Sequence, residues 1–223
     1  MLFPMIIAFA LSISVAVAIG IASLVGAWQA DLNFLAVVKE MFGALNKFPL
    51  AAIPFFILAG NLMESGGISA RLVEFAKSIV GGIQGGLAAT CVLTCMIFAA
   101  VSGSSVATTF AIGAILIPAL IKHGYPTSYA AALQATSAEL GVIIPPSIPM
   151  ILYGVAAEVS IGELFIAGVG PGLLIGGALM IFVIVYARWK GYGKGDHEGR
   201  LPFWAATRKA ALALLMPVII LGG

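Results

Sequence analysis

The chain has 223 residues, of which 61% are hydrophobic and only 9% are charged, and its mean hydropathy is +1.14. Soluble domains carry about 25% charged residues, so this composition excludes a soluble globular protein and predicts an all-α integral membrane protein. The formal net charge is only +2. We expect the chain to lie in the lipid bilayer and to bind no nucleic acid.

The first 84 residues are expected to form membrane spans, an external helix and one interfacial helix. Residues 4–26 are apolar and uncharged, which predicts a span that runs outward. Residues 31–46 are amphipathic and predict a helix outside the membrane, and residues 50–63 predict a span that returns.

The segment GGISARLVEFAKSIVGG follows, and its apolar side chains recur at helical spacing. Leu72, Phe75, Ala76 and Ile79 share one helical face, whereas the charged side chains lie elsewhere on the helix. An amphipathic helix of this kind is typical of the membrane surface. We therefore expect it to lie along the cytoplasmic interface.

The longest uncharged interval runs for 44 residues between Lys77 and Lys122. One helix of that length would extend roughly 66 Å, about twice the hydrocarbon core, so two passes with a turn near the middle are expected. The middle reads SGSS, residues 102–105, and carries no charge. Two full spans would place this turn in water, whereas a re-entrant hairpin would bury it in protein. The lack of charge favours a re-entrant helical hairpin over residues 86–122.

The next apolar segment is interrupted by the motif GVIIPPSIP, which contains Gly141, Pro145, Pro146 and Pro149. Each proline removes a backbone donor and clashes with the preceding turn, so a broken helix over residues 125–158 is expected. A simple proline kink is the alternative. Two interruptions in consecutive segments favour a binding function, because broken helices expose backbone groups that bind Na⁺ and anions.

Residues 162–187 predict one more span, and the distribution of lysine and arginine gives the orientation. Nine of the eleven cationic residues flank the hairpin or lie between residues 188 and 209, which predicts a cytoplasmic basic loop there. A new apolar run over residues 210–223 stops after 14 residues. We expect it to be the start of a further span that this sequence does not complete.

Four long motifs carry a family resemblance: FPLAAIPFFILAGNLMESGGIS, MIFAAVSGSSVATTFAIGAILIPALIKHGYP, LGVIIPPSIPMILYGV and SIGELFIAGVGPGLL. In this order they resemble the large membrane subunit of the tripartite ATP-independent periplasmic (TRAP) transporters. The resemblance implies Na⁺-coupled import of an organic acid, such as a C4-dicarboxylate or a sialic acid, across the bacterial inner membrane. It also implies an elevator-type mechanism in which a transport domain moves against a scaffold.

The family's large subunit contains two inverted repeats, and this chain resembles the first. The resemblance therefore implies that residues 1–84 belong to the scaffold and that residues 85–187 form one half of the transport domain. The implied partners are a small membrane subunit, a periplasmic substrate-binding protein and the C-terminal half of the same subunit. Na⁺ is the implied coupling ion, and no organic cofactor and no enzymatic activity are expected.

The candidate site combines the hairpin tip with the helix break. Serine hydroxyls and freed carbonyls are oxygen ligands that suit Na⁺ without burying a full charge. The expected Na⁺ ligands are Ser102, Gly103, Ser104, Ser105, Gly141, Val142 and Pro145. The expected contacts of the carboxylate substrate are Ser104, Ser105, Pro146 and Ser147.

Glu139 lies just before the break, where an ionisable group is costly unless it faces protein or water. We interpret it as an ionisable modulator of transport, with a neutral, hydrogen-bonded carboxyl as the alternative.

Two other functions stay open for the chain. A channel subunit would line a continuous water path with the same small residues, and a membrane-embedded enzyme would need a catalytic group that orients Ser104 and Glu139.

Overall fold

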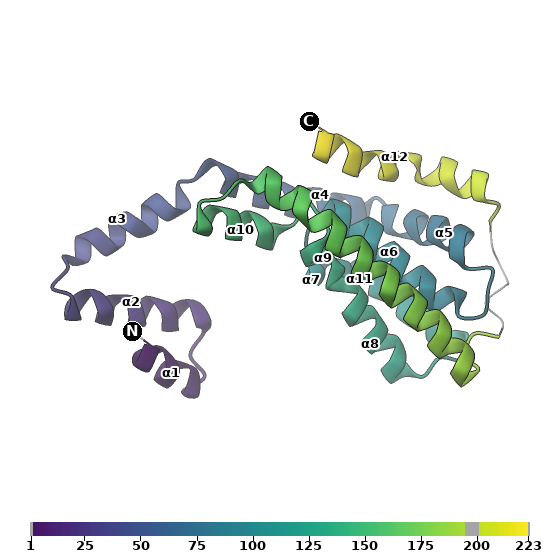
Figure 1. The fold of residues 1–223 in the computed structure, drawn as a ribbon, viewed down its shortest axis with the longest axis horizontal. Coiled ribbons are helices and arrows are strands. Elements are labelled where there is room, and N and C mark those ends of the chain that lie inside the picture. Colours follow the sequence, from purple (N-terminus) through teal and green to yellow (C-terminus); the bar gives the residue numbers. More distant parts are fainter. Residues whose placement is uncertain (1, 195–200, 223) are drawn as a thin grey trace. The chain divides into compact units, whose positions relative to one another are not determined.

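The computed structural model describes residues 2–194 and 201–222, and the chain divides into two compact units, Met1–Leu50 and Ala51–Gly223. Every regular element in the described residues is helical, and no strand occurs among them (Figure 1). Within residues 2–194 and 201–222, three segments are long and apolar enough to cross a membrane, and a bent helix pair forms a fourth candidate. The expected all-α membrane fold is confirmed.

The first unit begins with two short helices, α1 (Leu2–Ala10) and α2 (Val15–Gln29), that contact each other. The expectation of one continuous span over residues 4–26 is therefore wrong. The helix ends at the sequence LSIS, where Ser12 adopts a left-handed conformation with φ of 58°. Serine hydroxyls compete for backbone hydrogen bonds and favour turns over helix interiors, which gives the break a local cause.

The third helix of this unit, α3 (Phe34–Leu45), confirms the helix expected over residues 31–46. Its first turn is capped by Asn33, whose side chain accepts a hydrogen bond of 2.9 Å from the amide of Leu35. None of its residues is buried. Its place outside the membrane stays a prediction.

The second unit starts with a short 3-10 turn, Phe48–Ala51, that leads into α4 (Ala52–Ser65). Together they make an 18-residue segment apolar enough to span a bilayer, as expected for residues 50–63. Helix α5 (Ile68–Val80) follows, and its predicted apolar face exists. However, Leu72 and Ala76 are fully buried, since α5 packs against α6 and α12. Most of that face therefore contacts protein, whereas Ile79 at its end is exposed.

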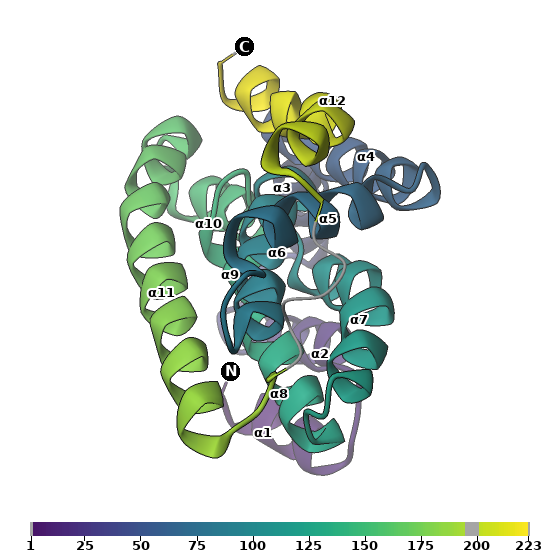
Figure 2. The same ribbon diagram turned by 90° about the vertical axis from the view of Figure 1, so that its right-hand side faces the viewer.

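The predicted hairpin consists of α6 (Gly86–Ser102) and α7 (Ser105–Lys122), joined at Gly103 and Ser104. Helix α6 lies at the centre of this unit, and 13 of its 17 residues are buried (Figure 2). Many of them are glycine, alanine, serine, threonine or cysteine, and such small side chains let neighbouring helices approach closely. The hairpin therefore has a rigid, protein-enclosed first arm.

The predicted broken helix is present as three pieces: α8 (Thr127–Ala138), the single turn α9 (Leu140–Ile143) and α10 (Ile148–Ala157). The two halves are bent by 41° across the break. Gln134 holds α8 against the hairpin, because it accepts a hydrogen bond from Cys91 at 3.1 Å and donates one to the carbonyl of Thr108 at 3.2 Å. This buried side chain links three helices.

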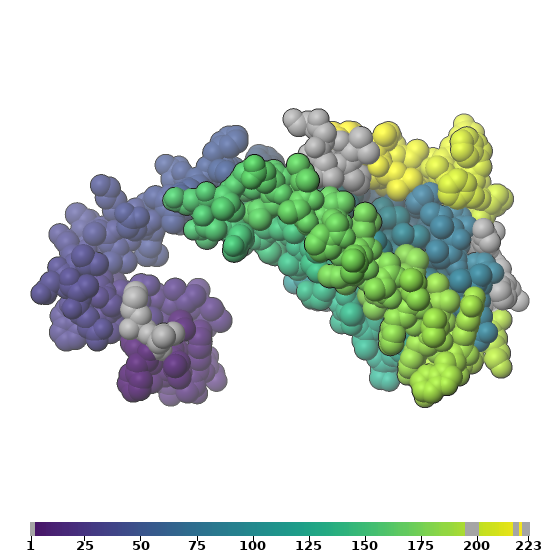
Figure 3. Space-filling model, viewed as in Figure 1, coloured from purple at the N-terminus to yellow at the C-terminus, as the bar shows by residue number. Residues whose placement is uncertain are grey.

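The expected span over residues 162–187 is longer than predicted, since α11 runs through Ile161–Lys190. The expected basic loop over residues 188–209 is shorter, because Arg188 lies in α11 and Arg208 lies in α12 (Phe203–Gly222). Residues 195–200 of that loop lie outside the described residues. Helix α12 also contains the run over residues 210–223 as far as Gly222, and it lies against α5 and α6 (Figure 3).

Candidate functional site

The hairpin tip rests directly on the helix break. Gly103 ends α6 in a left-handed conformation with φ of 61°, which glycine adopts at low cost. Its carbonyl oxygen accepts a hydrogen bond of 3.1 Å from the amide of Ile148, the first residue of α10. A Cβ atom on Gly103 would lie 2.6 Å from the carbonyl oxygen of Pro146. The turn therefore has no room for a side chain.

Gly141 makes the reciprocal contact from the other side of the interface. A Cβ atom there would lie 3.1 Å from the carbonyl carbon of Ser104 and 3.1 Å from the amide nitrogen of Ser105. The backbone of the tip thus contacts the break at two glycines, one contributed by each element. The structure brings together the two segments that the sequence singled out.

Three oxygen atoms cluster at the tip. The Thr108 hydroxyl donates to the carbonyl of Ser104 at 2.8 Å, and the Ser102 hydroxyl lies 3.3 Å from the Thr108 hydroxyl and 3.5 Å from that carbonyl. Ser102 and Thr108 are buried. The cluster is made of neutral oxygens, which is the donor chemistry that suits an alkali cation at membrane depth.

The two neighbouring serines differ in what their hydroxyls do. Ser104 caps α7, since its hydroxyl accepts a hydrogen bond of 3.4 Å from the amide of Ala107. The Ser105 hydroxyl has no hydrogen-bond partner in the described part of the chain, although the Ser105 carbonyl accepts from Thr109 at 2.8 Å. Ser105 therefore presents the more available side-chain oxygen.

The break itself is closed by a short side-chain hydrogen bond. The Ser147 hydroxyl donates to the carbonyl of Val142 at 2.6 Å, and Pro145, Pro146 and Ser147 are all buried. One lone pair of the Val142 carbonyl is therefore already used. Pro146 and Ser147 lie against the turn at Gly103, and Pro145 as a Na⁺ ligand stays a prediction.

Four helix ends meet where the tip contacts the break. The carboxyl ends of α6 and α9 carry partial negative charge, and the amino ends of α7 and α10 carry partial positive charge. Carbonyls at helix carboxyl ends attract cations, and amides at helix amino ends attract carboxylates. One small region thus offers groups suited to both a cation and an organic anion.

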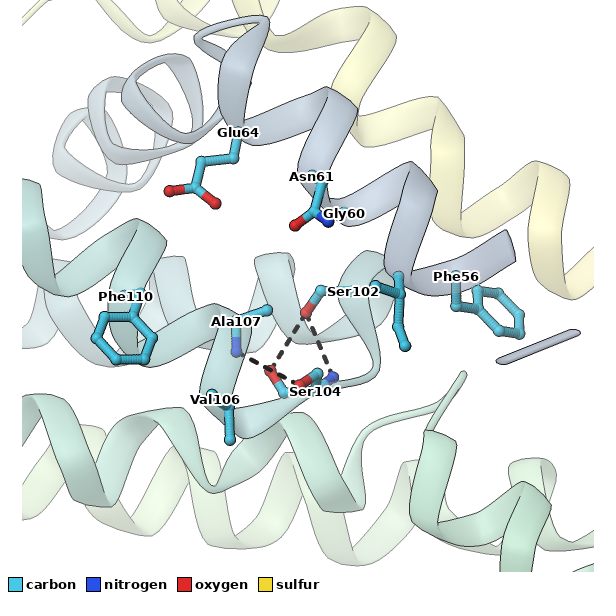
Figure 4. A pocket seen from close by; sticks show the side chains of 10 residues that line it. Phe56, Gly60, Asn61, Glu64, Ser102, Ser104, Val106, Ala107 and Phe110 are labelled. Carbon is cyan, nitrogen blue, oxygen red and sulfur yellow. Dashed lines mark hydrogen bonds between the residues drawn. The ribbon is translucent and has the colours of Figure 1, made fainter. Parts of the chain in front are cut away.

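A pocket of about 330 Å³ opens beside this region. Ser102 and Ser104 line it from the hairpin, and Asn61 and Glu64 line it from α4 (Figure 4). In the close-up view the polar side chains of α4 face the tip across the pocket. The exposed Glu64 brings a full negative charge to a pocket otherwise lined by neutral and apolar groups.

The sequence interpretation missed Asn61, Glu64 and Thr108. A signal for the first two was present, since polar residues three apart inside an apolar span mark a functional face. Thr108 lies one helical turn after Ser104 and belongs to the same hydroxyl-rich motif. Glu139, in contrast, is exposed at the end of α8 and does not line the pocket.

The family described as "Tripartite ATP-independent periplasmic transporter, DctM component" matches residues 1–223. The chain belongs to this TRAP transporter family. The match covers every motif that the resemblance rested on, including the hairpin tip and the helix break. The protein is a multi-pass membrane protein by its family and by its apolar helices.

Individual TRAP relatives agree with the family match. The chain is 46% identical over 184 residues to the C4-dicarboxylate large permease protein DctM of Pseudomonas aeruginosa, covering 82% of this chain and 43% of that protein. A C4-dicarboxylate large permease protein of Vibrio cholerae is 42% identical, with 95% of this chain and 47% of the relative covered. The sialic acid large permease protein SiaM of Vibrio cholerae is 39% identical, over 86% and 44% respectively.

This chain spans about half the length or less of these curated TRAP relatives. Their names describe permease proteins of transporters, and they specify different organic acids. Relatives of similar identity to this chain are therefore named for more than one substrate.

Proposed function

We propose that the complete protein is the large membrane subunit of a Na⁺-coupled secondary importer of organic acids in the bacterial inner membrane. It would receive a carboxylate, such as a C4-dicarboxylate or a sialic acid, from a periplasmic binding protein. A small membrane subunit and a second half of the same subunit would complete the assembly. The region described above supplies half of the site.

The observation that carries this proposal is the seating of the hairpin tip on the helix break. The oxygen cluster of Ser102, Ser104 and Thr108 fits a cation of low charge, because every donor is a neutral hydroxyl or carbonyl. The Ser105 hydroxyl adds an oxygen without a partner among the described residues. Na⁺ bound there would neutralise part of a carboxylate's charge and so couple the two bindings.

The substrate carboxylate would be held by the amino ends of α7 and α10, which begin at Ser105 and Ile148. Ser147 would stabilise the break, because its hydroxyl donates to the Val142 carbonyl at 2.6 Å. Gly103 and Gly141 let the two backbones approach closely enough for both helix ends to reach one ligand.

An elevator-type movement would carry the hairpin and the break past α4. The contact that supports this mechanism is between small residues, since a Cβ atom on Gly60 would lie 3.6 Å from the Cβ atom of Ser102. Small side chains leave few interlocking ridges to resist sliding. The pocket beside that contact would change shape as the two parts move.

Reconstitution of the complete transporter tests the proposal. We expect uptake of at least one carboxylate in a panel only when a Na⁺ gradient and the binding protein are present. Uptake that proceeds equally in K⁺ would contradict Na⁺ coupling. Steady single-channel current under the same conditions would instead favour a channel. We expect residues 1–223 alone to show no uptake, because half of the site is absent.

A further inference from the structure

A second groove lies between α5 and α12, and it shares no lining residue with the pocket beside the hairpin tip. Its volume is about 560 Å³, and its lining is largely charged. The lining residues come from two helices that pack side by side in Figures 1 and 2: Gly67, Ala70, Arg71, Glu74, Arg208, Lys209 and Leu212. None of these residues belongs to the candidate transport site.

The charges in the groove do not cancel. Lys209 pairs with Glu74 at 3.4 Å, and both side chains are about half exposed. Arg71 and Arg208 have no ion-pair partner in the described part of the chain. Guanidinium groups bind phosphate oxygens through paired N–H donors, so two unpaired arginines in one groove favour a phosphate-bearing ligand.

Next to the groove, α12 carries exposed apolar side chains on the same side as Arg208. Trp204, Arg208, Leu212 and Leu215 follow one another at helical spacing, and Trp204 and Leu212 are 78% and 75% exposed. Tryptophan concentrates at the membrane interface, arginine at the phosphate level and leucine in the hydrocarbon. The groove therefore combines a headgroup region with an adjoining surface for acyl chains.

The cation distribution in the sequence predicts the cytoplasmic side for these helix ends. Basic pockets between helices on that side are suited to anionic lipid headgroups. We propose that the groove between α5 and α12 binds the phosphate headgroup of an anionic phospholipid, with Arg71 and Arg208 as the phosphate ligands. The acyl chains lie along Leu212 and Leu215. This lipid fastens α5 to α12 and acts independently of Na⁺ coupling.

Native mass spectrometry of the complete, delipidated transporter tests the proposal with dioleoyl phosphatidylglycerol as the probe. The double variant Arg71→Gln with Arg208→Gln leaves the Glu74–Lys209 pair in place. We expect it to bind this lipid about tenfold more weakly, since each cation near a headgroup contributes substantially to binding. The matched control is Arg188→Gln with Lys122→Gln, which removes two exposed cations outside the groove and should keep the wild-type affinity.

Three arms identify the ligand and exclude loss of folding. Phosphatidylcholine should bind at least tenfold more weakly than phosphatidylglycerol, and inorganic phosphate should not compete at millimolar concentration. A photoreactive residue at position 212 should cross-link to lipid. Equal lipid affinity in both double variants, effective competition by free phosphate, or cross-linking to a protein chain would overturn the proposal. Both double variants should elute in gel filtration as the wild-type assembly does. If one of them does not, the cross-link from position 212 decides whether the groove binds lipid.

Discussion

The hairpin tip and the groove between α5 and α12 show two different ways of preparing a polar surface in a membrane protein. At the tip, a Cβ atom added to Gly103 or Gly141 would lie 2.6 to 3.1 Å from backbone atoms of the facing element, and the surrounding polar groups are mostly buried. In the groove, long side chains such as Lys209 and Glu74 remain about half exposed. The tip should therefore be sensitive to a single added carbon, whereas the groove should tolerate even the loss of a charge.

The largest effect is expected for Gly103→Ala. The added Cβ would lie 2.6 Å from the Pro146 carbonyl oxygen, and alanine disfavours the left-handed conformation. Strain and overpacking together should cost about 2 to 5 kcal/mol. We expect a large fall in the thermal stability of the complete transporter and nearly complete loss of uptake. Gly170→Ala is the matched control, because nothing lies within 4 Å of its Cβ position; equal behaviour of the two variants would refute tight seating.

The next effect concerns the polar link behind the tip. Gln134→Leu removes the bonds to Cys91 and to the Thr108 carbonyl inside the protein. Leaving such groups unpaired costs about 1 to 3 kcal/mol, so the midpoint of thermal unfolding should fall measurably. Gln29→Leu, at an exposed position, should change it little. A stability equal to wild type in Gln134→Leu would show that the link is dispensable.

A smaller effect is expected in the pocket beside the tip. Glu64→Gln removes an exposed carboxylate that faces Ser104 across the pocket, and exposed charge interactions contribute up to about 1 kcal/mol. The apparent Na⁺ affinity of uptake should weaken by roughly twofold to fivefold. Glu40→Gln on α3 changes the same charge elsewhere and should leave it unchanged. A tighter Na⁺ affinity in Glu64→Gln would contradict an electrostatic contribution.

The smallest effect on Na⁺ is expected at Glu139, which lies outside the pocket. As an ionisable modulator it should alter the pH dependence of uptake in Glu139→Gln, with the apparent Na⁺ affinity kept within about twofold. Uptake measured between pH 5 and 8 tests this expectation. A pH profile that superimposes on wild type would favour the alternative, a neutral carboxyl without a part in transport.

Much of the fold could be predicted from the sequence where a strong physical constraint acts on backbone. A 44-residue uncharged interval cannot be one span, and Pro145 with Pro146 cannot continue a helix, so the hairpin and the break follow directly. The break in residues 4–26 was missed, because LSIS contains neither glycine nor proline and its two serines are a weaker turn signal. The apolar composition of this segment alone predicts one continuous span.

The candidate site was predictable in its main elements and not in its surroundings. SGSS and GVIIPPSIP stand out locally. Asn61 and Glu64 also stand out as polar residues in an apolar segment, but their place beside the tip depends on the packing of α4 against the hairpin. The apolar face of α5 was recognised, but its burial against α6 and α12 depends on contacts with later segments of the chain. Local pattern identifies a face, and tertiary packing decides what covers it.

The central claim is that the hairpin tip supplies oxygen ligands to a Na⁺ ion. The most direct test is the apparent Na⁺ affinity of uptake by the complete transporter carrying Ser105→Ala, with Ser23→Ala as the control. Ser104→Ala also removes a helix cap, whereas the Ser105 hydroxyl makes no hydrogen bond within the described residues. We predict that Ser105→Ala weakens the affinity for Na⁺ by about fivefold to tenfold, corresponding to the loss of one oxygen ligand, with assembly intact. Unchanged Na⁺ dependence in both Ser105→Ala and Ser104→Ala would contradict a role for these side chains.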